Sequence, residues 1–328
     1  MRESHQPPYS LIFMGSPDFA VPSLVALHDD PAFTLSAVFS MPDRPKGRGH
    51  KETMTPVKRK ALEFGIPVHT PESLKRQPEF IEMIGNLKPQ LLVVVAYGLI
   101  LPKSVLDAAT VGAVNLHASL LPAYRGPSPI HFAIQNGDSV TGNTVMLMTE
   151  GMDEGDILAS ESVPIDPEDT LESLHDRLSA LGAPLLVRTL HDFAVGKVVP
   201  VPQDPSNASY TSKITVEKAR IDWGKSGTTL VNLIRAMIPF PGAWAEYEGE
   251  RLKIGKAIAC QPASASASAS AAPAAPGTIL TASPREGLIV ACGNGTTIQI
   301  LSMQRPGKAL LPINEFLRGF SFQAGRLG

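Results

Sequence analysis

The chain has 328 residues, which is more than one hydrophobic core usually supports, so we expect two domains. Hydrophobic residues make up 43% and charged residues 18% of the sequence, which excludes a chain that is disordered throughout. The formal net charge is −2, and no stretch approaches the roughly 20 apolar residues of a membrane span, so we expect a soluble protein without a membrane partner.

Cysteine content and the first residues indicate the cellular setting. Cys260 and Cys292 have neither the spacing of metal ligands nor partners for a disulfide framework. The start, MRESHQPPYSLIFMG, has no apolar run long enough for a signal peptide. We therefore expect a cytoplasmic protein. The histidines, cysteines and acids form no zinc-binding pattern, so we expect no metal.

The first part of the chain alternates predicted strands and helices. Residues 10–15, SLIFMG, form a short apolar run stopped by glycine, which predicts a buried strand. Ser16 and Pro17 follow as the predicted N-cap and first residue of a helix. A second strand is predicted over 34–40, and the segment 55–65 predicts a helix closed by glycine.

The alternation continues to about residue 197. Residues 90–96, QLLVVVA, are nearly all apolar and β-branched, as expected of a central strand buried on both faces. Residues 112–118 predict another strand, and residues 170–196 predict a helix. This pattern predicts an α/β domain over 1–197 with a Rossmann-like, doubly wound, mostly parallel sheet. The segment GSPDFA lacks the G-x-G-x-x-G pattern, so a dinucleotide site is not expected.

The rest of the chain differs in composition and in its predicted elements. Residues 198–211 are rich in proline and polar residues and predict a linker. Residues 212–328 contain an amphipathic helix over 226–238 and then short strands, which predict a smaller β-barrel domain, OB-like in architecture. The Ala, Ser and Pro tract over 261–277 is expected to be a disordered insertion, and we assign it no function.

Charge is distributed unevenly along the chain. Residues 1–209 carry 16 Lys and Arg against 24 Asp and Glu, a net −8, whereas residues 210–328 carry 13 against 7, a net +6. This asymmetry favours a polyanion as the partner of the second domain, although small domains are often modestly basic without such a partner.

Two polar residues lie in the predicted strand over 112–118. Asn115 and His117 are two positions apart, so their side chains point to the same face. They lie near the carboxyl end of the strand, where open α/β sheets bind ligands. A hydrogen-bonded pair in the core is the alternative. Two polar neighbours among apolar strands favour a functional site.

A basic loop is predicted over Met41–Lys51, MPDRPKGRGHK. Its glycines and prolines predict a loop and not a helix. The candidate phosphate-binding side chains are those of Arg44, Lys46, Arg48 and Lys51, with His50 beside them. A solvated surface loop is the alternative. Because the first domain is otherwise acidic, we favour contact with RNA.

Several motifs together carry a family resemblance. NLHASLLPAYRGPSPI, with MDEGDI downstream and AYGLILP upstream, closely resembles the folate-dependent formyltransferases. GSPDFAVPSL, MPDRPKGRGHK, IDWGKSG and FPGAW resemble the branch of that family whose acceptor is initiator methionyl-tRNA. The resemblance spans the chain except for the Ala/Ser insertion, and His50 departs from a run that is usually more uniformly lysine-rich.

The resemblance implies the activity and its residues. It implies transfer of a formyl group from 10-formyltetrahydrofolate to the amino group of initiator methionyl-tRNA, for translation initiation, with the second domain binding tRNA. Asp153 falls where the family carries its catalytic aspartate, beside Asn115 and His117. The folate is implied to lie against the segment Ser119, Leu120, Leu121 and Pro122 and to be edged by the backbone of Ala96, Tyr97 and Gly98.

These residue types suit formyl transfer between nitrogens. Asn115 can donate an amide N–H to the carbonyl oxygen as it gains negative charge. His117 can accept the amine proton or, when protonated, stabilise the same oxygen. Asp153 can orient His117 or bind the water through which the proton leaves. No covalent intermediate is expected, and the protein is expected to be a monomer.

Other functions are compatible with parts of this pattern. The same catalytic residues could serve glycinamide ribonucleotide or an amino-sugar nucleotide as acceptor, or water in a formyltetrahydrofolate hydrolase. A non-catalytic RNA-binding protein is the alternative from another class. The basic loop and basic second domain argue against a small acceptor, and a binding protein would not need Asn115 and His117.

Overall fold

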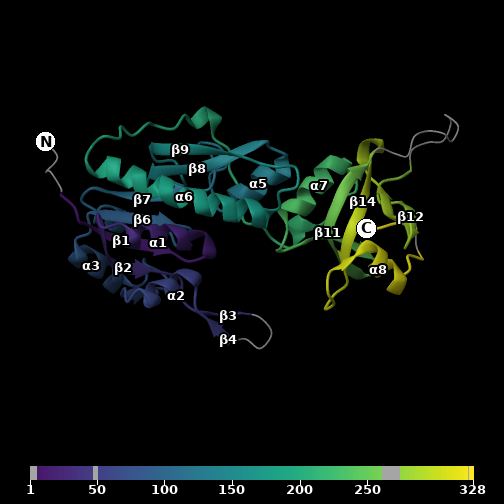
Figure 1. Cartoon of the computed structure of the whole chain (residues 1–328), viewed down its shortest axis with the longest axis horizontal. Helices are drawn as coiled ribbons and strands as arrows, with labels where there is room; N and C mark the ends of the chain where they lie inside the picture. Colours follow the sequence, from purple (N-terminus) through teal and green to yellow (C-terminus); the bar gives the residue numbers. More distant parts are fainter. Residues whose placement is uncertain (1–5, 47–50, 261–273, 324) are drawn as a thin grey trace. The chain divides into compact units, whose positions relative to one another are not determined.

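The computed structural model describes residues 6–46, 51–260, 274–323 and 325–328. The chain divides into two compact units (Figure 1). Unit 1 consists of residues 1–129, 140–164 and 175–211, and unit 2 of residues 130–139, 165–174 and 212–328. No helix in the described ranges combines the length and apolarity needed to cross a bilayer.

Unit 1 is built on a seven-stranded sheet with the order β5-β2-β1-β6-β7-β8-β9. The strands β5, β2, β1, β6 and β7 pair in parallel, and β8 and β9 add an antiparallel edge. Their bounds are β1 Tyr9–Gly15, β2 Phe33–Phe39, β5 Val68–His69, β6 Leu91–Val95, β7 Gly112–His117, β8 Val140–Leu147 and β9 Ile157–Pro164. From β1 the chain first adds β2 and β5 on one side of the sheet and then β6, β7, β8 and β9 on the other. The doubly wound, mostly parallel sheet is therefore confirmed.

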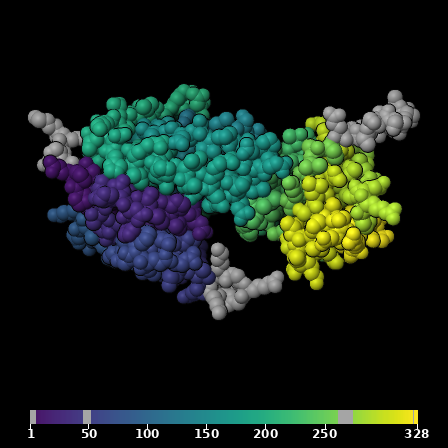
Figure 2. Space-filling view, in the orientation of Figure 1, coloured from purple at the N-terminus to yellow at the C-terminus, as the bar shows by residue number. Residues whose placement is uncertain are grey.

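Helices cover this sheet. Their bounds are α1 Val21–Asp29, α2 Pro56–Glu63, α3 Pro78–Leu87, α4 Lys103–Leu106 and α6 Leu171–Ala194, of which residues 171–174 belong to unit 2. Helix α5, Pro129–Asn136, belongs to unit 2 from residue 130 onward. The helices α3 and α4 pack on the sheet face that carries Ile12 and Leu92, while α1 and α6 cross the front of the sheet in Figure 1. In Figure 2 the purple and teal parts of unit 1 form one continuous surface, although they are far apart in sequence.

The central strand β6 explains the stability of this arrangement. Its five residues, LLVVV, are all buried, as a strand covered on both faces requires. Its neighbours on either side are β1 and β7, so the strand that carries Asn115 and His117 is held against the middle of the sheet.

Two local predictions in unit 1 were wrong. Ser16 is not a helix N-cap: a 3-10 turn over Asp18–Ala20 precedes α1, and the Ser16 hydroxyl donates to the carbonyl of Tyr97 at 3.0 Å. The basic segment is not an irregular loop throughout, because β3, Arg44–Lys46, pairs with β4, Lys51–Thr53, as an antiparallel hairpin. Two strands of three residues each are too short to show a period-2 pattern in the sequence.

The segment predicted as a linker, residues 198–211, belongs to unit 1. We call it the strap. Val201 exchanges backbone hydrogen bonds with Ile157 at 2.8 and 2.9 Å, and the Arg125 N–H donates to Ser209 at 2.8 Å. The Thr211 N–H donates to the carbonyl of Arg125 at 2.7 Å, and unit 2 resumes at residue 212. The lack of periodicity therefore reflects a segment whose only regular element is the 3-10 turn Pro205–Asn207 and which bonds to the start of β9 and to the loop after β7.

Unit 2 contains the predicted helix and strands. Helix α7 spans Gly227–Ala236 with Ser226 as its N-cap. The strands are β10 Ala243–Tyr247, β11 Glu250–Cys260, β12 Ile279–Ser283, β13 Gly287–Ala291, β14 Thr297–Gln304 and β15 Leu311–Pro312, followed by α8, Ile313–Gly319. Both helices contribute to one core with the sheet, which includes Trp244, Ile254, Ile300 and Phe316.

The predicted OB-like barrel is not confirmed. The sheet is antiparallel with the order β10-β11-β14-β13-β12, and no pairing between β10 and β12 closes it in the described part of the chain. The last residues lie between these edges instead: Gly328 exchanges backbone hydrogen bonds with Glu246 of β10, and Leu327 donates to Gly277 just before β12. Residues 261–273 of the predicted insertion lie outside the described residues.

We expect the Leu92→Ala substitution to lower the free energy of unfolding by about 2–5 kcal/mol, because Leu92 is fully buried in β6 and truncation leaves a cavity. The measurement is urea unfolding followed by circular dichroism. Leu62→Ala on α2 is the matched control, since Leu62 is 49% exposed and should change stability by no more than about 0.5 kcal/mol. Equal losses for the two variants would contradict the assignment of β6 to the core.

Candidate functional site

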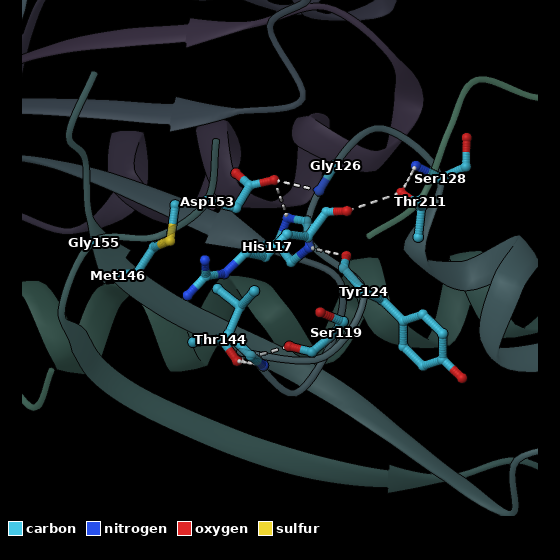
Figure 3. A network of polar contacts seen from close by, with 12 residues as sticks. His117, Ser119, Tyr124, Gly126, Ser128, Thr144, Met146, Asp153, Gly155 and Thr211 are labelled. Atoms are coloured by element: carbon cyan, nitrogen blue, oxygen red, sulfur yellow. Dashed lines mark hydrogen bonds and ion pairs between the residues drawn. The ribbon is translucent and has the colours of Figure 1, made fainter. Parts of the chain in front are cut away.

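Strand β7 places two polar side chains inside unit 1. Asn115 lies between Val94 of β6 and Met146 of β8, and His117 ends the strand opposite Thr144 of β8. Both polar residues are only 7% exposed. The turn that follows β8 brings Asp153 beside His117 (Figure 3). The residues predicted to be catalytic thus come from two segments, β7 with Asn115 and His117 and this turn with Asp153.

One contact determines the tautomer of the neutral His117 ring. Its Nε2 lies 3.0 Å from the carbonyl oxygen of Tyr124. A carbonyl oxygen can only accept, so Nε2 must carry the hydrogen. In the neutral ring the other nitrogen, Nδ1, then has a free lone pair, which makes it the basic nitrogen.

The basic nitrogen of His117 faces a carboxylate. Nδ1 lies 3.7 Å from Oδ2 of Asp153, which is too far for a hydrogen bond but close enough for attraction once the ring is protonated. Oδ2 also accepts the backbone N–H of Gly126 at 2.7 Å. The pair can therefore take up a proton at Nδ1 and stabilise the imidazolium that results.

Asn115 supplies hydrogen-bond donors. Its side-chain amide makes no hydrogen bond with any other described residue, although Asn115 is almost completely buried. Buried amides in proteins nearly always have partners. The amide is thus available to an oxygen atom of a ligand bound beside β7.

The segment 119–122 forms a closed turn after β7. The Ser119 hydroxyl donates to the carbonyl of Ala123 at 2.7 Å, and the Thr144 hydroxyl donates to the carbonyl of Ser119 at 2.7 Å. The same hydroxyl accepts the N–H of Leu121 at 3.1 Å. Ser119 is fully buried and Leu121 nearly so, whereas Leu120 and Pro122 are half-buried. The segment therefore presents apolar surface, while the Ser119 hydroxyl is engaged within the protein.

The segment Ala96–Gly98 follows the central strand β6. Ala96 and Gly98 have positive φ angles of 48° and 95° and are exposed, so this backbone turns outward. The Tyr97 side chain instead lies in the core beside α3 and α4, where burial raises the pKa of its hydroxyl. The backbone of this segment and the small Ala96 side chain are therefore exposed, while the Tyr97 ring is not.

The basic hairpin begins beside these residues. The Met41 N–H donates to the Ser16 hydroxyl at 3.1 Å, and Asp43 pairs with Lys58 of α2 at 2.7 Å. Arg44 is exposed, and Lys46 and Lys51 lie in the paired strands β3 and β4. Arg48, the fourth predicted RNA contact, lies outside the described residues.

Two buried residues of this site were not predicted from the sequence. Arg125 is 3% exposed and bonds to Gln203 of the strap, which in turn bonds to the backbone of Asp153. Arg125 was part of the motif that carried the resemblance, and Gln203 was placed in the predicted linker. A polar glutamine in an aperiodic segment gives no signal of burial.

The described residues contain no group of three or more His, Cys, Asp or Glu side chains that could hold a metal ion. The candidate site combines a histidine, a carboxylate and an amide. This set of groups suits attack on a carbonyl carbon, because it can accept a proton and donate to a developing oxyanion.

Family models match both parts of the chain. The model described as formyl transferase matches residues 10–190, and the model of the formyl transferase C-terminal domain matches residues 213–321. The methionyl-tRNA formyltransferase of Clostridium novyi is 43% identical over 313 residues, which cover 95% of this chain and 97% of that protein. The protein of the same name from Geobacillus thermodenitrificans is 44% identical over 94% of each chain.

Solved structures share the fold at lower identity. An N-formyltransferase from Helicobacter canadensis, in complex with folinic acid and dTDP-3-aminofucose, matches with a TM-score of 0.64 and 19% identity over 90% of this chain and 98% of its own. HypX from Aquifex aeolicus, in complex with tetrahydrofolic acid, matches with a TM-score of 0.58 and 17% identity over 94% of this chain and 46% of its own.

We expect Gly126→Ala to disturb the loop that holds Asp153. Gly126 has φ +107°, and an added Cβ would lie 2.9 Å from the carbonyl oxygen of Thr211. Gly65→Ala is the matched control, because Gly65 also has a positive φ, +70°, but no atom within 4 Å of the added Cβ. In urea unfolding, Gly65→Ala should cost about 1–2 kcal/mol, and Gly126→Ala at least about 1 kcal/mol more. Equal losses in the free energy of unfolding would show that the strap moves to accommodate the added methyl group.

Proposed function

This chain belongs to the formyl transferase family, and we propose that it transfers the formyl group of 10-formyltetrahydrofolate to the amino group of initiator methionyl-tRNA. The pairing of His117 Nδ1 with Asp153 beside the free amide of Asn115 carries the proposal, because formyl transfer needs a base and an oxyanion donor together. The relatives that share more than 40% identity over nearly the whole chain are named for this reaction.

The proposed reaction begins with attack of the amine nitrogen on the formyl carbon. The carbonyl oxygen then gains negative charge, and the Asn115 amide donates a hydrogen bond to it. The loss of one such donor typically costs about 2.7–4 kcal/mol of transition-state stabilisation. The amine can attack only when it has lost the proton of its ammonium form, and the nitrogen must lose a further proton as the new bond forms.

The geometry favours His117 as the group that takes this proton. Its Nε2–H is engaged by the Tyr124 carbonyl, which leaves Nδ1 as the acceptor, directed toward Asp153. Asp153 then stabilises the imidazolium by charge attraction. The carbon–nitrogen bond to the folate breaks as the folate nitrogen receives the proton, so the products are the formylated amine and tetrahydrofolate.

We place the folate against the apolar turn of Leu120, Leu121 and Pro122, with the backbone of Ala96–Gly98 at its edge. A flat heterocycle suits an apolar slot with a few backbone partners. The relatives in complex with folinic acid and tetrahydrofolic acid share the fold and support this choice of donor. Since the Ser119 hydroxyl bonds to Ala123, we assign its contribution to the shape of the turn.

We assign the tRNA to the basic hairpin, Arg44–Thr53, and to unit 2. The hairpin is anchored beside the segment proposed to meet the folate, and the residues from 210 onward carry the net positive charge. We propose that the protein acts as a monomer in the cytoplasm, without a metal, because translation initiation takes place there and the proposed chemistry needs only side chains.

A small acceptor is the main alternative, since the Helicobacter canadensis structure holds an amino-sugar nucleotide. One assay separates the possibilities: the protein is mixed with 10-formyltetrahydrofolate and either initiator methionyl-tRNA, glycinamide ribonucleotide, an amino-sugar nucleotide or no acceptor, and tetrahydrofolate is followed. Turnover with methionyl-tRNA alone supports the proposal. Turnover with a small acceptor or with water in its place would overturn it.

We expect Asn115→Ala and His117→Ala each to lower kcat by about a hundredfold, because they remove the oxyanion donor and the base. Formyl transfer to methionyl-tRNA is the measurement. Asn86→Ala, on the exposed side of α3, is the control and should leave kcat unchanged. Near-normal turnover in either site variant would remove that residue from the mechanism.

We expect Arg44→Ala to weaken tRNA binding and leave folate binding unchanged, since Arg44 is exposed on the hairpin. If it neutralises one phosphate, the slope of log affinity against log salt should become shallower by about 1. Titrations of tRNA at several salt concentrations measure this slope. Arg76→Ala, an exposed arginine outside the hairpin, should not change it. An unchanged slope for Arg44→Ala would show that Arg44 does not contact a phosphate and would favour the alternative of a solvated surface hairpin.

A further inference from the structure

The strap places one amide group at the back of the site. Gln203 is 9% exposed, and its Nε2 donates to the carbonyl oxygens of Asp153 at 2.8 Å and Gly155 at 2.7 Å. Its Oε1 accepts from Nη2 of Arg125 at 2.8 Å and from Nε at 3.1 Å. One side chain therefore connects a buried guanidinium with the turn that carries Asp153.

The orientation of this amide follows from its partners. A guanidinium can only donate, so Oε1 of Gln203 must face Arg125. The two backbone carbonyls can only accept, so the NH2 group must face Asp153 and Gly155. Every hydrogen-bonding atom of the amide is used in one arrangement, and the reversed amide would satisfy none of these partners.

Arg125 is placed to orient Gln203. It is 3% exposed, and no carboxylate in the described part of the chain forms an ion pair with it. Its other partner is the hydroxyl of Tyr210, at 3.2 Å from Nη1, with the ring centroid 5.8 Å from the guanidinium carbon. Since burial of a charge without a counterion is unfavourable, these hydrogen bonds must compensate for the water that Arg125 has lost.

The turn that Gln203 holds has a conformation that needs support. Asp153 has a φ of +52°, a left-handed conformation that is unfavourable for a residue with a side chain. It is bonded at both ends: the Gly126 N–H holds its carboxylate and Gln203 holds its carbonyl. Gly155 is tightly packed as well, because an added Cβ would lie 1.9 Å from the carbonyl oxygen of Leu147.

We propose that Gln203, oriented by Arg125, is a positioning residue that keeps the Asp153 carboxylate opposite Nδ1 of His117. Gln203 does not touch the reacting atoms in this scheme. It acts through Asp153, and its contribution is to the rate of the proton transfer and not to the binding of either substrate. The proposal rests on the proposed function, in which His117 and Asp153 handle the amine proton.

The test is Gln203→Glu, which keeps the volume of the side chain and an acceptor for Arg125 but replaces the donors to Asp153 and Gly155 with oxygen. We expect kcat for formyl transfer to fall by about tenfold, since displacement of a catalytic group by a fraction of an ångström already slows the reaction. The KM values for folate and tRNA should stay within about twofold. Gln77→Glu, an equivalent change just before α3 in unit 1 that keeps the acceptor for the Glu72 and Ser73 N–H groups, is the matched control and should leave kcat unchanged.

A double-mutant cycle with Asp153→Asn tests whether Gln203 acts through Asp153. The loss caused by Gln203→Glu should shrink from about tenfold to less than about twofold when Asp153 is already replaced, because coupled residues are not additive. Single-turnover measurements make the slow variants accessible. Equal losses in the two backgrounds, or an unchanged kcat in Gln203→Glu, would overturn the proposal.

Stability is measured in parallel, so that a folding defect is recognised. If Gln203→Glu unfolds at the assay temperature, Arg125→Lys replaces it in the same cycle, because lysine keeps the charge but not the fork that orients Oε1. We expect a loss of about fivefold in kcat that again disappears in the Asp153→Asn background. A wild-type protein that transfers no formyl group would overturn the proposed function itself, a result distinct from either outcome of the cycle.

Discussion

The hydrogen bond between Nε2 of His117 and the carbonyl of Tyr124 is the contact on which the rest of the site depends. It assigns the hydrogen to one ring nitrogen and leaves the lone pair on the other. In the other tautomer Nδ1 would carry the hydrogen and direct it at Asp153, and the lone pair of the ring would face the Tyr124 carbonyl, where it could not serve an incoming amine. The backbone of the loop after β7 therefore determines the chemistry of a side chain on β7.

That loop has several anchors, and each comes from a different part of unit 1. Thr144 of β8 bonds to the backbone of Ser119 and Leu121. Ser209 and Thr211 of the strap bond to the backbone of Tyr124, Arg125 and Ser128. A loop held on both sides has few alternative conformations, so its carbonyl and N–H groups can serve as preorganised partners of His117 and Asp153.

Hydrogen bonds explain why the strap, an aperiodic and proline-rich segment, is part of unit 1. Such a segment buries little apolar surface, so hydrogen bonds must hold it in place. The bonds made by Val201, Gln203 and Thr211 do this, and those of Gln203 also connect the strap to the turn of Asp153. The bonds of Gln203 thus contribute both to the attachment of the strap and to the position of that turn.

The sequence alone was sufficient for the features that depend on local pattern. The apolar run of β6 predicted a strand buried on both faces, and the two-residue spacing of Asn115 and His117 predicted that both lie in one strand, β7. The motifs around them predicted the family. The short strands of unit 2 were also predicted, because the alternation of apolar and polar residues and the turn residues between strands are visible in the local sequence.

The tertiary structure alone decided how distant residues meet. The Tyr124 N–H and the Ser209 hydroxyl that it reaches are 85 residues apart in sequence, and Gln203 lies 50 residues from Asp153. The choice of Nδ1 as the basic nitrogen, the burial of Arg125 and the open sheet of unit 2 all depend on such contacts. They have no signature in local periodicity, because hydrogen bonds between loops are formed by single atoms whose positions depend on the whole fold.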